Sequence, residues 1–199
     1  MNFTDASDAI ITYARELWDR RLTTGTSGNL SARLDDGDIL VTPTGRSARN
    51  LRVDELVRVM PTGQARSPGA CPTSELPLHL AAYRVRDDID CVIHSHPTFC
   101  VVWTKTGTIF ARDTVGASET LGEVGWAPYY APGSQQLANA CADVFARGCA
   151  CVLMERHGLS CAGRGFEEAF ILTDLAEEAA RIAYFSRLLG PLAEEAAVG

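Results

Sequence analysis

Apolar residues recur at three- to four-residue spacing in several segments of the chain. In residues 5–20, for example, Ile10, Tyr13 and Leu17 fall on one face of a helix. Further helices are predicted over residues 74–86, from about residue 97, where a proline suits a helix start, over 134–145, and over 166–189, the last with the same spacing. The first and the last predicted helix therefore each have an apolar face to bury against the rest of the fold.

Short apolar runs lie between the predicted helices. They predict strands over residues 29–33, 39–42, 56–60, 91–93 and 150–154, and the turn Asp35-Asp36-Gly37 predicts a hairpin between the first two. Residues 106–132 are rich in glycine and show no clear period, and a loop is expected after residue 154. Hairpins occur where a doubly wound fold would need crossovers. The pattern therefore predicts an α/β fold, a three-layer α/β/α sandwich with a mixed, mostly antiparallel central sheet.

The length and composition favour one domain. A chain of 199 residues, 46% of them hydrophobic, can bury one substantial core and is short for two, so residues 1–199 are expected to form a single domain. No apolar run approaches the length of a membrane span, and the first residues lack the basic and apolar regions of a secretion signal. A cytoplasmic protein without a membrane partner is expected.

The acidic balance of the chain argues against nucleic acid as a partner. The net charge is -7 and the 18 basic residues are scattered, whereas a nucleic-acid surface needs a dense cluster of Lys and Arg. Backbone N–H groups can nevertheless hold a small phosphate without side-chain charge. A small phosphorylated ligand therefore remains compatible with the composition.

Three of the four histidines follow predicted strands. His94 and His96 are two residues apart, so on a strand they point to the same side and can share one metal ion. Hydrogen bonding at the strand end is an equally favoured interpretation of this pair. His157 follows another apolar run, and Gly158 beside it would permit a sharp backbone turn that aims the ring. Three protein ligands with an open position are typical of a catalytic zinc-type site.

Glu75 and His79 lie four residues apart on a predicted helix and therefore share a face. A carboxylate near a helix start helps to cap it, and this structural role is the favoured interpretation of the spacing alone. The functional alternative makes Glu75 a general base or a fourth metal contact.

Three short segments combine exposed backbone N–H groups with small hydroxyl or amide side chains. They are Ser27-Gly28-Asn29, Thr44-Gly45 and Thr73-Ser74, the last of which precedes a predicted helix. Such segments can hold an anion, and a helix N-terminus adds its dipole. Any one of them alone is most often a turn.

Taken in order, these motifs resemble the class II aldolase/adducin family, with the spacing of its L-fuculose-1-phosphate aldolase branch. The resemblance runs from about residue 10 to residue 188 and rests on residues 25–31, 42–45, 73–75, 94–96 and 157–158. It implies a zinc ion, with manganese or cobalt as alternatives, held by His94, His96 and His157. It also implies that Glu75 is the acid/base residue beside the ion.

The resemblance further implies a small phosphorylated sugar as substrate and a homotetramer as the assembly. The implied phosphate contacts are Gly28, Asn29, Thr44, Gly45, Thr73 and Ser74. The implied reaction is that of a metal-dependent aldolase, a lyase that cleaves a ketose 1-phosphate similar to fuculose or ribulose phosphate. The products would be dihydroxyacetone phosphate and an aldehyde, formed through a metal-stabilised enediolate.

Other members of the family form comparable enolates. Epimerases usually carry Asp at the position of Glu75 and Lys in the loop 42–45, and neither occurs here. A decarboxylase of a phosphorylated keto sugar acid would want a cation near the departing carboxylate, for which Arg46, Arg112 or Lys105 would serve. A dehydratase of a sugar phosphate is a further alternative. A non-enzymatic, adducin-like module is disfavoured, because such domains need not keep the metal ligands, whereas all three histidines are present in this chain.

The sequence departs from the aldolase pattern at one point. Aldolases of the family use a tyrosine from a neighbouring subunit to protonate the aldehyde oxygen, but residues 111–115 contain no tyrosine, and the short C-terminal tail lacks one as well. Tyr129 and Tyr130 are the nearest candidates in sequence. The identity of the aldehyde is therefore open, and this departure argues against natural fuculose phosphate.

Overall fold

The computed structural model describes residues 1–112 and 114–197, and within them seven strands form one sheet. The strands are β1 (Asn29–Arg33), β2 (Ile39–Val41), β3 (Val57–Val59), β4 (Cys91–Ser95), β5 (Val124–Ala127), β6 (Cys151–Met154) and β7 (Gly158–Gly163). Their order in the sheet is β3-β2-β1-β4-β7-β6-β5. Every neighbouring pair is antiparallel except β5 and β6, which are parallel. The predicted mixed, mostly antiparallel sheet is confirmed.

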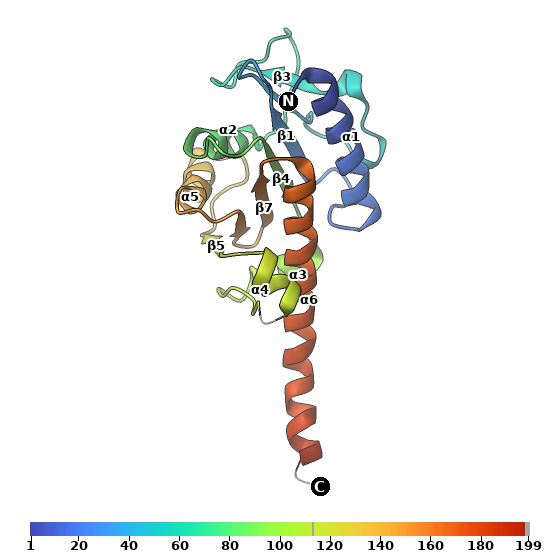
Figure 1. Ribbon diagram of the computed structural model, residues 1–199, viewed down its shortest axis with the longest axis vertical. Helices are drawn as coiled ribbons and strands as arrows, with labels where there is room; N and C mark the ends of the chain where they lie inside the picture. The colour runs from blue at the N-terminus through green and yellow to red at the C-terminus, as the bar shows by residue number, and fades with distance from the viewer. Residues whose placement is uncertain (113, 198–199) are drawn as a thin grey trace.

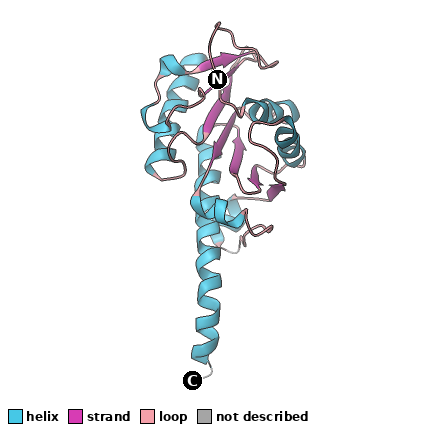
Figure 2. Cartoon of the chain, turned by 180° about the vertical axis from the view of Figure 1, so that it is seen from behind, coloured by secondary structure: helices cyan, strands magenta, loops and turns pink. Residues whose placement is uncertain are grey.

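Helices cover both faces of the sheet (Figure 1, Figure 2). One face carries α1 (Phe3–Asp19), α3 (Thr98–Trp103), α4 (Val115–Thr120) and α6 (Phe166–Ala197). The other face carries α2 (Leu76–Val85) and α5 (Gln135–Ala146). Two short 3-10 helices, Ala48–Asn50 and Val53–Glu55, lie between β2 and β3. This arrangement confirms the three-layer α/β/α sandwich.

Helix α1 packs through the face that its apolar spacing predicts. Ile10 and Leu17 are fully buried in one cluster with Leu30 of β1, and burying such a side chain contributes roughly 1.5–3 kcal/mol. The helix begins after Asn2, whose side chain accepts a hydrogen bond from the Asp5 N–H and so caps the first turn.

Alternation along β4 sends neighbouring side chains to opposite faces of the sheet. Cys91 and Ile93 pack in the cluster that contains α1, whereas Val92 packs in the cluster that contains α2 and α5. His94 is two residues beyond Val92, so its ring lies on the α2 and α5 side. The strand period thus decides which layer of the fold contains the histidine site.

Besides the two 3-10 helices, three elements were not predicted from the sequence: β5, α4 and β7. The first two lie in the glycine-rich segment 106–132, where no period is visible. Strand β7 occupies the segment expected to be a loop, and all six of its residues are buried. It lies between β4 and β6 in the middle of the sheet. A strand buried on both faces shows no alternation, and the glycines at its two ends resemble a loop in sequence.

A buried carboxylate ties the β1–β2 hairpin to β3 and to the segment that follows β3. Asp38 is buried and accepts hydrogen bonds from Arg66 at 2.7 and 2.8 Å and from Arg58 at 2.6 Å. The hydrogen bonds from Arg66, reinforced by the one from Arg58, lower the pKa of Asp38 from 3.8 to about 2. Because the pKa is lower in the folded state, this cluster stabilises the fold above pH 3.8, and the contribution is lost as the pH falls through about 2.

We expect Asp38→Asn to lower the free energy of unfolding at neutral pH. The difference from the wild type should shrink as the pH falls from 3.8 toward 2, because the wild-type carboxylate becomes protonated over that range. Urea unfolding at a series of pH values measures this difference. A difference that stays constant over the range would contradict the assignment of the pKa shift to Asp38.

Helix α6 runs well beyond the sheet (Figure 1). Its outer part exposes Phe185, Leu188 and Leu189, each at least half accessible to solvent. None of the described helices is long and apolar enough to cross a membrane.

Candidate metal centre

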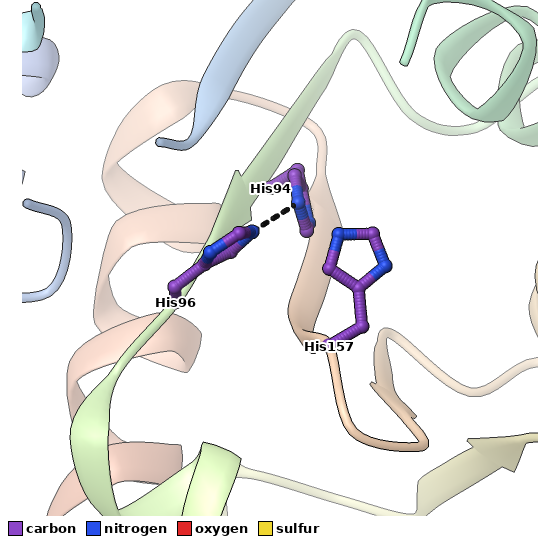
Figure 3. A group of neighbouring side chains, drawn as sticks. All are labelled: His94, His96 and His157. Carbon is purple, nitrogen blue, oxygen red and sulfur yellow. Dashed lines mark hydrogen bonds between the residues drawn. The ribbon is translucent and has the colours of Figure 1, made fainter. Parts of the chain in front are cut away.

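The structure brings three of the four histidines together at one end of the sheet (Figure 3). His94 lies in β4, His96 follows that strand, and His157 lies in the turn between β6 and β7. One ring nitrogen from each of the three lies within 4.8 Å of the others. The two-residue spacing thus places His94 and His96 as predicted, and β7 brings the turn that carries His157 beside them.

Hydrogen bonds orient the ring of His94. Its Nδ1 lies 3.1 Å from the Leu159 carbonyl oxygen and 3.2 Å from Ser160 Oγ. A carbonyl oxygen only accepts, so Nδ1 carries the hydrogen and Nε2 keeps a free lone pair. This Nε2 lies 2.9 Å from His96 Nε2. Strand β7 therefore sets both the tautomer and the direction of the His94 ring.

All three imidazoles are neutral near neutral pH. Burial lowers the pKa of His94 well below its usual value, with smaller effects from His96 and His157. Burial also lowers the pKa of His96, and it lowers the pKa of His157 to about 4. Metal ions bind the neutral form of imidazole, so the protein holds these rings in the state that a metal ion requires.

The side chains fit a divalent ion. Three neutral imidazoles converge, and the buried Nδ1 of His157 has no hydrogen-bond partner among the described residues. Nitrogen donors in this number suit zinc and several other transition metals, and three protein ligands leave a coordination position for a substrate.

Glu75 lies beside this cluster. It is buried at the N-cap of α2, and its Oε1 lies 3.8 Å from His157 Nε2. Its Oε2 has no hydrogen-bond partner in the described part of the chain. Burial raises the pKa of Glu75, and the backbone N–H of Gly133 opposes this rise. The carboxyl group can therefore hold a proton more readily than an exposed glutamate.

The three candidate phosphate segments gather at the same end of the sheet. Asn29 of β1 is paired with His94 of β4. A Cβ on Gly28 would lie 3.0 Å from the His94 carbonyl oxygen, so this segment approaches the metal-site strand closely. The loop after β2 meets the start of α2, because the Thr73 N–H donates to the Thr42 carbonyl at 3.0 Å.

The candidate phosphate residues differ in what their side chains do. Thr44, Gly45 and Ser74 are exposed. The Thr73 hydroxyl is buried and accepts a hydrogen bond from the Glu75 N–H at 3.2 Å. The Thr73 side chain therefore orders the turn that leads into α2, a local structural role typical of this residue type.

The turn that carries His157 is built differently from the sequence-based interpretation. Arg156, not Gly158, adopts the left-handed conformation, with a φ of 54°. Gly158 is already part of β7, and its position leaves no room for a side chain. A Cβ there would clash with the Ser95 carbonyl oxygen and lie 2.9 Å from His96 Cδ2. The glycine allows β7 to approach β4 beside the histidines. The idea that Gly158 turns the backbone to aim His157 was wrong.

Gly158→Ala is expected to weaken metal binding by roughly 10–100-fold, the range seen when the support of a ligand is lost. The added methyl group would displace His96 or separate β7 from β4. Competition with a chromophoric chelator measures the affinity. Gly165→Ala is the matched control, because a Cβ at Gly165 meets nothing within 4 Å. Equal metal affinity in the two variants would contradict this account.

Several contributors to the site were not identified from the sequence. Ser160 and the Leu159 carbonyl orient His94, and the Gly133 N–H faces Glu75. Gly133 has a φ of +74°, and a Cβ there would lie 2.7 Å from the Ser74 carbonyl oxygen. Gly133 precedes Ser134, the N-cap of α5, so the sequence indicates a turn there. Nothing in the sequence places that turn against Glu75.

The candidate residues for assisting the departing group lie in separate loops. Arg46 is paired with Glu55 in the loop after β2. Tyr129 lies beside the His157 turn, since the Arg156 guanidinium sits 4.3 Å from its ring centroid. Tyr129 and Tyr130 are both exposed. Asp113, within the tyrosine-free segment 111–115, lies outside the described residues.

Comparison with known proteins identifies the family of this chain. Residues 8–184 match the family model of the class II aldolase and adducin N-terminal domain. The chain is 31% identical over 180 residues to L-fuculose phosphate aldolase of Methanocaldococcus jannaschii, which covers 90% of this chain and 96% of that protein. It is 32% identical over 176 residues to 3-oxo-tetronate 4-phosphate decarboxylase of Escherichia coli (strain K12), which covers 86% and 82%.

A solved structure extends the comparison to the fold. The crystal structure of YgbL from Klebsiella pneumoniae, a candidate aldolase, epimerase or decarboxylase, matches with a TM-score of 0.86 at 28% identity. The match covers 96% of this chain and 92% of that one. Together with the family model, which spans most of the chain, these matches show that the chain belongs to the class II aldolase/adducin family.

Proposed function

We propose that this chain is a metal-dependent carbon–carbon lyase that acts on a small phosphorylated ketose. The observation that carries the proposal is the position of Glu75 beside three neutral imidazoles, with a buried oxygen that has no partner among the described residues. Imidazoles alone would also suit a structural ion. A buried carboxyl group with a raised pKa supplies a proton donor and acceptor at the same place, as a lyase requires.

In this proposal His94, His96 and His157 hold zinc, with manganese or cobalt as alternatives. When bound, the ion would polarise the ketone oxygen and stabilise the negative charge that bond cleavage leaves behind. Leu159 and Ser160 keep the His94 lone pair directed at the ion site. Gly28, Asn29, Thr44, Gly45, Thr73 and Ser74 are the proposed phosphate segment, in which Thr73 acts by shaping the start of α2.

The two activities named for the relatives converge on one fragment. Cleavage of the bond between C3 and C4 of a ketose 1-phosphate leaves the enediolate of dihydroxyacetone phosphate and releases an aldehyde. Loss of carbon dioxide from a 3-oxo-tetronate 4-phosphate leaves the same enediolate. In both cases the carboxyl group of Glu75 would deliver its proton to the carbon that has lost its partner, and dihydroxyacetone phosphate would result.

The departing group separates the two reactions. Aldol cleavage requires a base that takes the proton of the hydroxyl group that becomes the aldehyde, whereas a carboxylate leaves as carbon dioxide without one. We place aldol cleavage first, with the exposed Tyr129 or Tyr130 as the nearest candidates in sequence for taking that proton. Decarboxylation is the second candidate, favoured by the 32% identity to a decarboxylase and by the tyrosine-free segment 111–115.

A product assay tests the proposal. The zinc-loaded protein is incubated with a panel of ketose 1-phosphates and, separately, with a 3-oxo-tetronate 4-phosphate, and dihydroxyacetone phosphate is measured. We expect its release together with an aldehyde, and loss of release with a chelator. Release with carbon dioxide from the keto acid alone would select the decarboxylase. No release from either substrate, with metal bound, would reject the lyase and favour an epimerase or dehydratase.

Metal content separates these enzymes from a non-enzymatic, adducin-like module. A protein that binds no divalent ion under metal-replete conditions would overturn every enzyme proposed here. Plasma emission spectroscopy of the purified protein gives this result before any substrate is needed.

We also propose that the chain forms one domain and assembles as a homotetramer in the cytoplasm. The exposed apolar residues Phe185, Leu188 and Leu189 on the protruding part of α6 support self-association, because a monomer would leave them in water (Figure 1). Light scattering coupled to size-exclusion chromatography measures the assembly, and a monomer at micromolar concentration would contradict it.

A further inference from the structure

A chain of buried hydrogen bonds leads from Asn29 into the interior of the protein. His79 Nε2 contacts Asn29 Oδ1, and His79 Nδ1 lies 2.7 Å from Ser31 Oγ. Ser31 Oγ lies 2.8 Å from the hydroxyl of Tyr83. His79 and Ser31 are fully buried, and Tyr83 is 6% exposed. Two residues of β1 and two of α2 therefore form one continuous chain behind the candidate phosphate site.

Only one arrangement of hydrogen atoms satisfies every contact in this chain. Tyr83 donates to Ser31, Ser31 donates to His79 Nδ1, and the His79 Nε2–H donates to Asn29 Oδ1. In the reverse arrangement the Tyr83 hydrogen would have no acceptor among the described residues, and the amide of Asn29 would have to turn over. A buried donor without a partner is costly, so the first arrangement is favoured.

The protonation state of His79 agrees with this direction. Burial lowers the pKa of His79 to about 3, so the ring is neutral and has one hydrogen to donate. With that hydrogen on Nε2, the carbonyl oxygen of Asn29 is occupied from the interior. The Nδ2 group of Asn29, with two hydrogens, then faces away from His79, on the residue that is paired with His94.

We propose that His79 is a positioning residue that holds the amide of Asn29 with both Nδ2 hydrogens available to the phosphate of the substrate. This inference rests on the proposed function in one respect, because it takes Asn29 as a phosphate contact. A turned amide would present its carbonyl oxygen to the phosphate and repel it. His79 therefore makes the site selective for an anionic group over a neutral one, without touching the ligand.

The tautomer of His79 can be measured in the wild-type protein. With only four histidines in the chain, long-range ¹H–¹⁵N correlation spectra of the zinc-loaded protein should resolve each ring. We expect His79 to be neutral with its hydrogen on Nε2. A hydrogen on Nδ1, or a charged ring, would overturn the proposal whatever reaction the protein catalyses.

Ligand binding tests the consequence for recognition. We measure the binding of dihydroxyacetone phosphate and of dihydroxyacetone to the zinc-loaded protein by calorimetry. His79→Leu should weaken binding of the phosphate ester by roughly tenfold, the value of one hydrogen bond to a charged group. Binding of dihydroxyacetone and the zinc content should not change. His79→Gln, whose amide can donate to Asn29, should recover part of the loss.

Leu78→Ala is the matched control, because Leu78 is buried on the same helix but lies outside the chain of hydrogen bonds. It should lower the melting temperature without selective loss of the phosphate ester. If His79→Leu does not fold, Tyr83→Phe, which removes the hydroxyl at the far end, should give a smaller loss in the same direction. Equal losses for both ligands, or none, would show that His79 only supports the fold.

These outcomes separate the inference from the proposed function. A wild-type protein that binds dihydroxyacetone phosphate but cleaves no substrate would reject the lyase and leave the role of His79 measurable. A wild-type protein that binds neither ligand would overturn the phosphate site and this inference with it.

Discussion

Replacing Glu75 with glutamine is expected to lower kcat by about 10²–10⁴-fold, the usual contribution of a positioned acid/base group. Glutamine has nearly the same shape as glutamate, but its amide neither gives up nor takes a proton near neutral pH and so cannot act as an acid or a base. The proposed ligands are the three imidazoles, and Glu75 lies beside them with its Oε1 3.8 Å from His157 Nε2. The metal content should therefore remain that of the wild type. Turnover at saturating substrate and metal analysis of the same preparation measure the two quantities.

Glu16→Gln on α1 is the matched control, because the same chemical change is made on an exposed residue. Its kcat should equal that of the wild type. Two results would count against the assignment of Glu75: unchanged turnover in Glu75→Gln, or a loss of metal that matches its loss of turnover. The second result would make Glu75 a metal ligand.

His94→Ala should have the largest effect on metal binding. His94 is buried, its ring is held by Leu159 and Ser160, and its Nε2 lies 2.9 Å from His96 Nε2. Loss of a direct ligand should weaken binding beyond the roughly 10–100-fold caused by loss of a supporting hydrogen bond. Turnover should fall in parallel and return only in part with excess metal. Competition with a chromophoric chelator measures the affinity.

Val92→Ala controls for a general loosening of the strand. Val92 is buried on the same strand and the same face as His94, so its truncation lowers stability without removing a nitrogen donor. Its metal affinity should stay close to that of the wild type. If His94→Ala, His96→Ala and His157→Ala all retain the full metal content, the proposed ligand set is wrong.

The fold class and most elements could be predicted from the sequence, because a surface helix or a half-buried strand displays its period. The helix with Ile10 and Leu17 shows this for α1. The pattern failed at β7, where burial on both faces removes the alternation. It also failed for β5, because the pairing of β5 with β6 depends on residues distant in the sequence.

The site shows the same division. His94 and His96 could be placed together because two residues of one strand share a side. The position of His157 depends on β7, so the sequence supplied only its residue type and the turn around it. Glu75 was expected to cap a helix. It stands at the N-cap of α2, but its side chain makes no capping hydrogen bond there, and its N–H donates to the Thr73 hydroxyl in the turn before the helix. The role of Gly158 could not be foreseen, because the sequence shows the glycine but not which strand it approaches.

The distance along the chain between His94 and His157 has a consequence for the lifetime of the protein. An unfolded chain would not hold these residues together, so an ion bound at the proposed site would favour the folded state. Each tenfold rise in free metal above the dissociation constant would then raise the free energy of unfolding by up to about 1.4 kcal/mol. In a cell starved of metal, the apoprotein would unfold more often and meet proteases more often. The abundance of the protein would then follow the metal supply even while its rate of synthesis stayed constant.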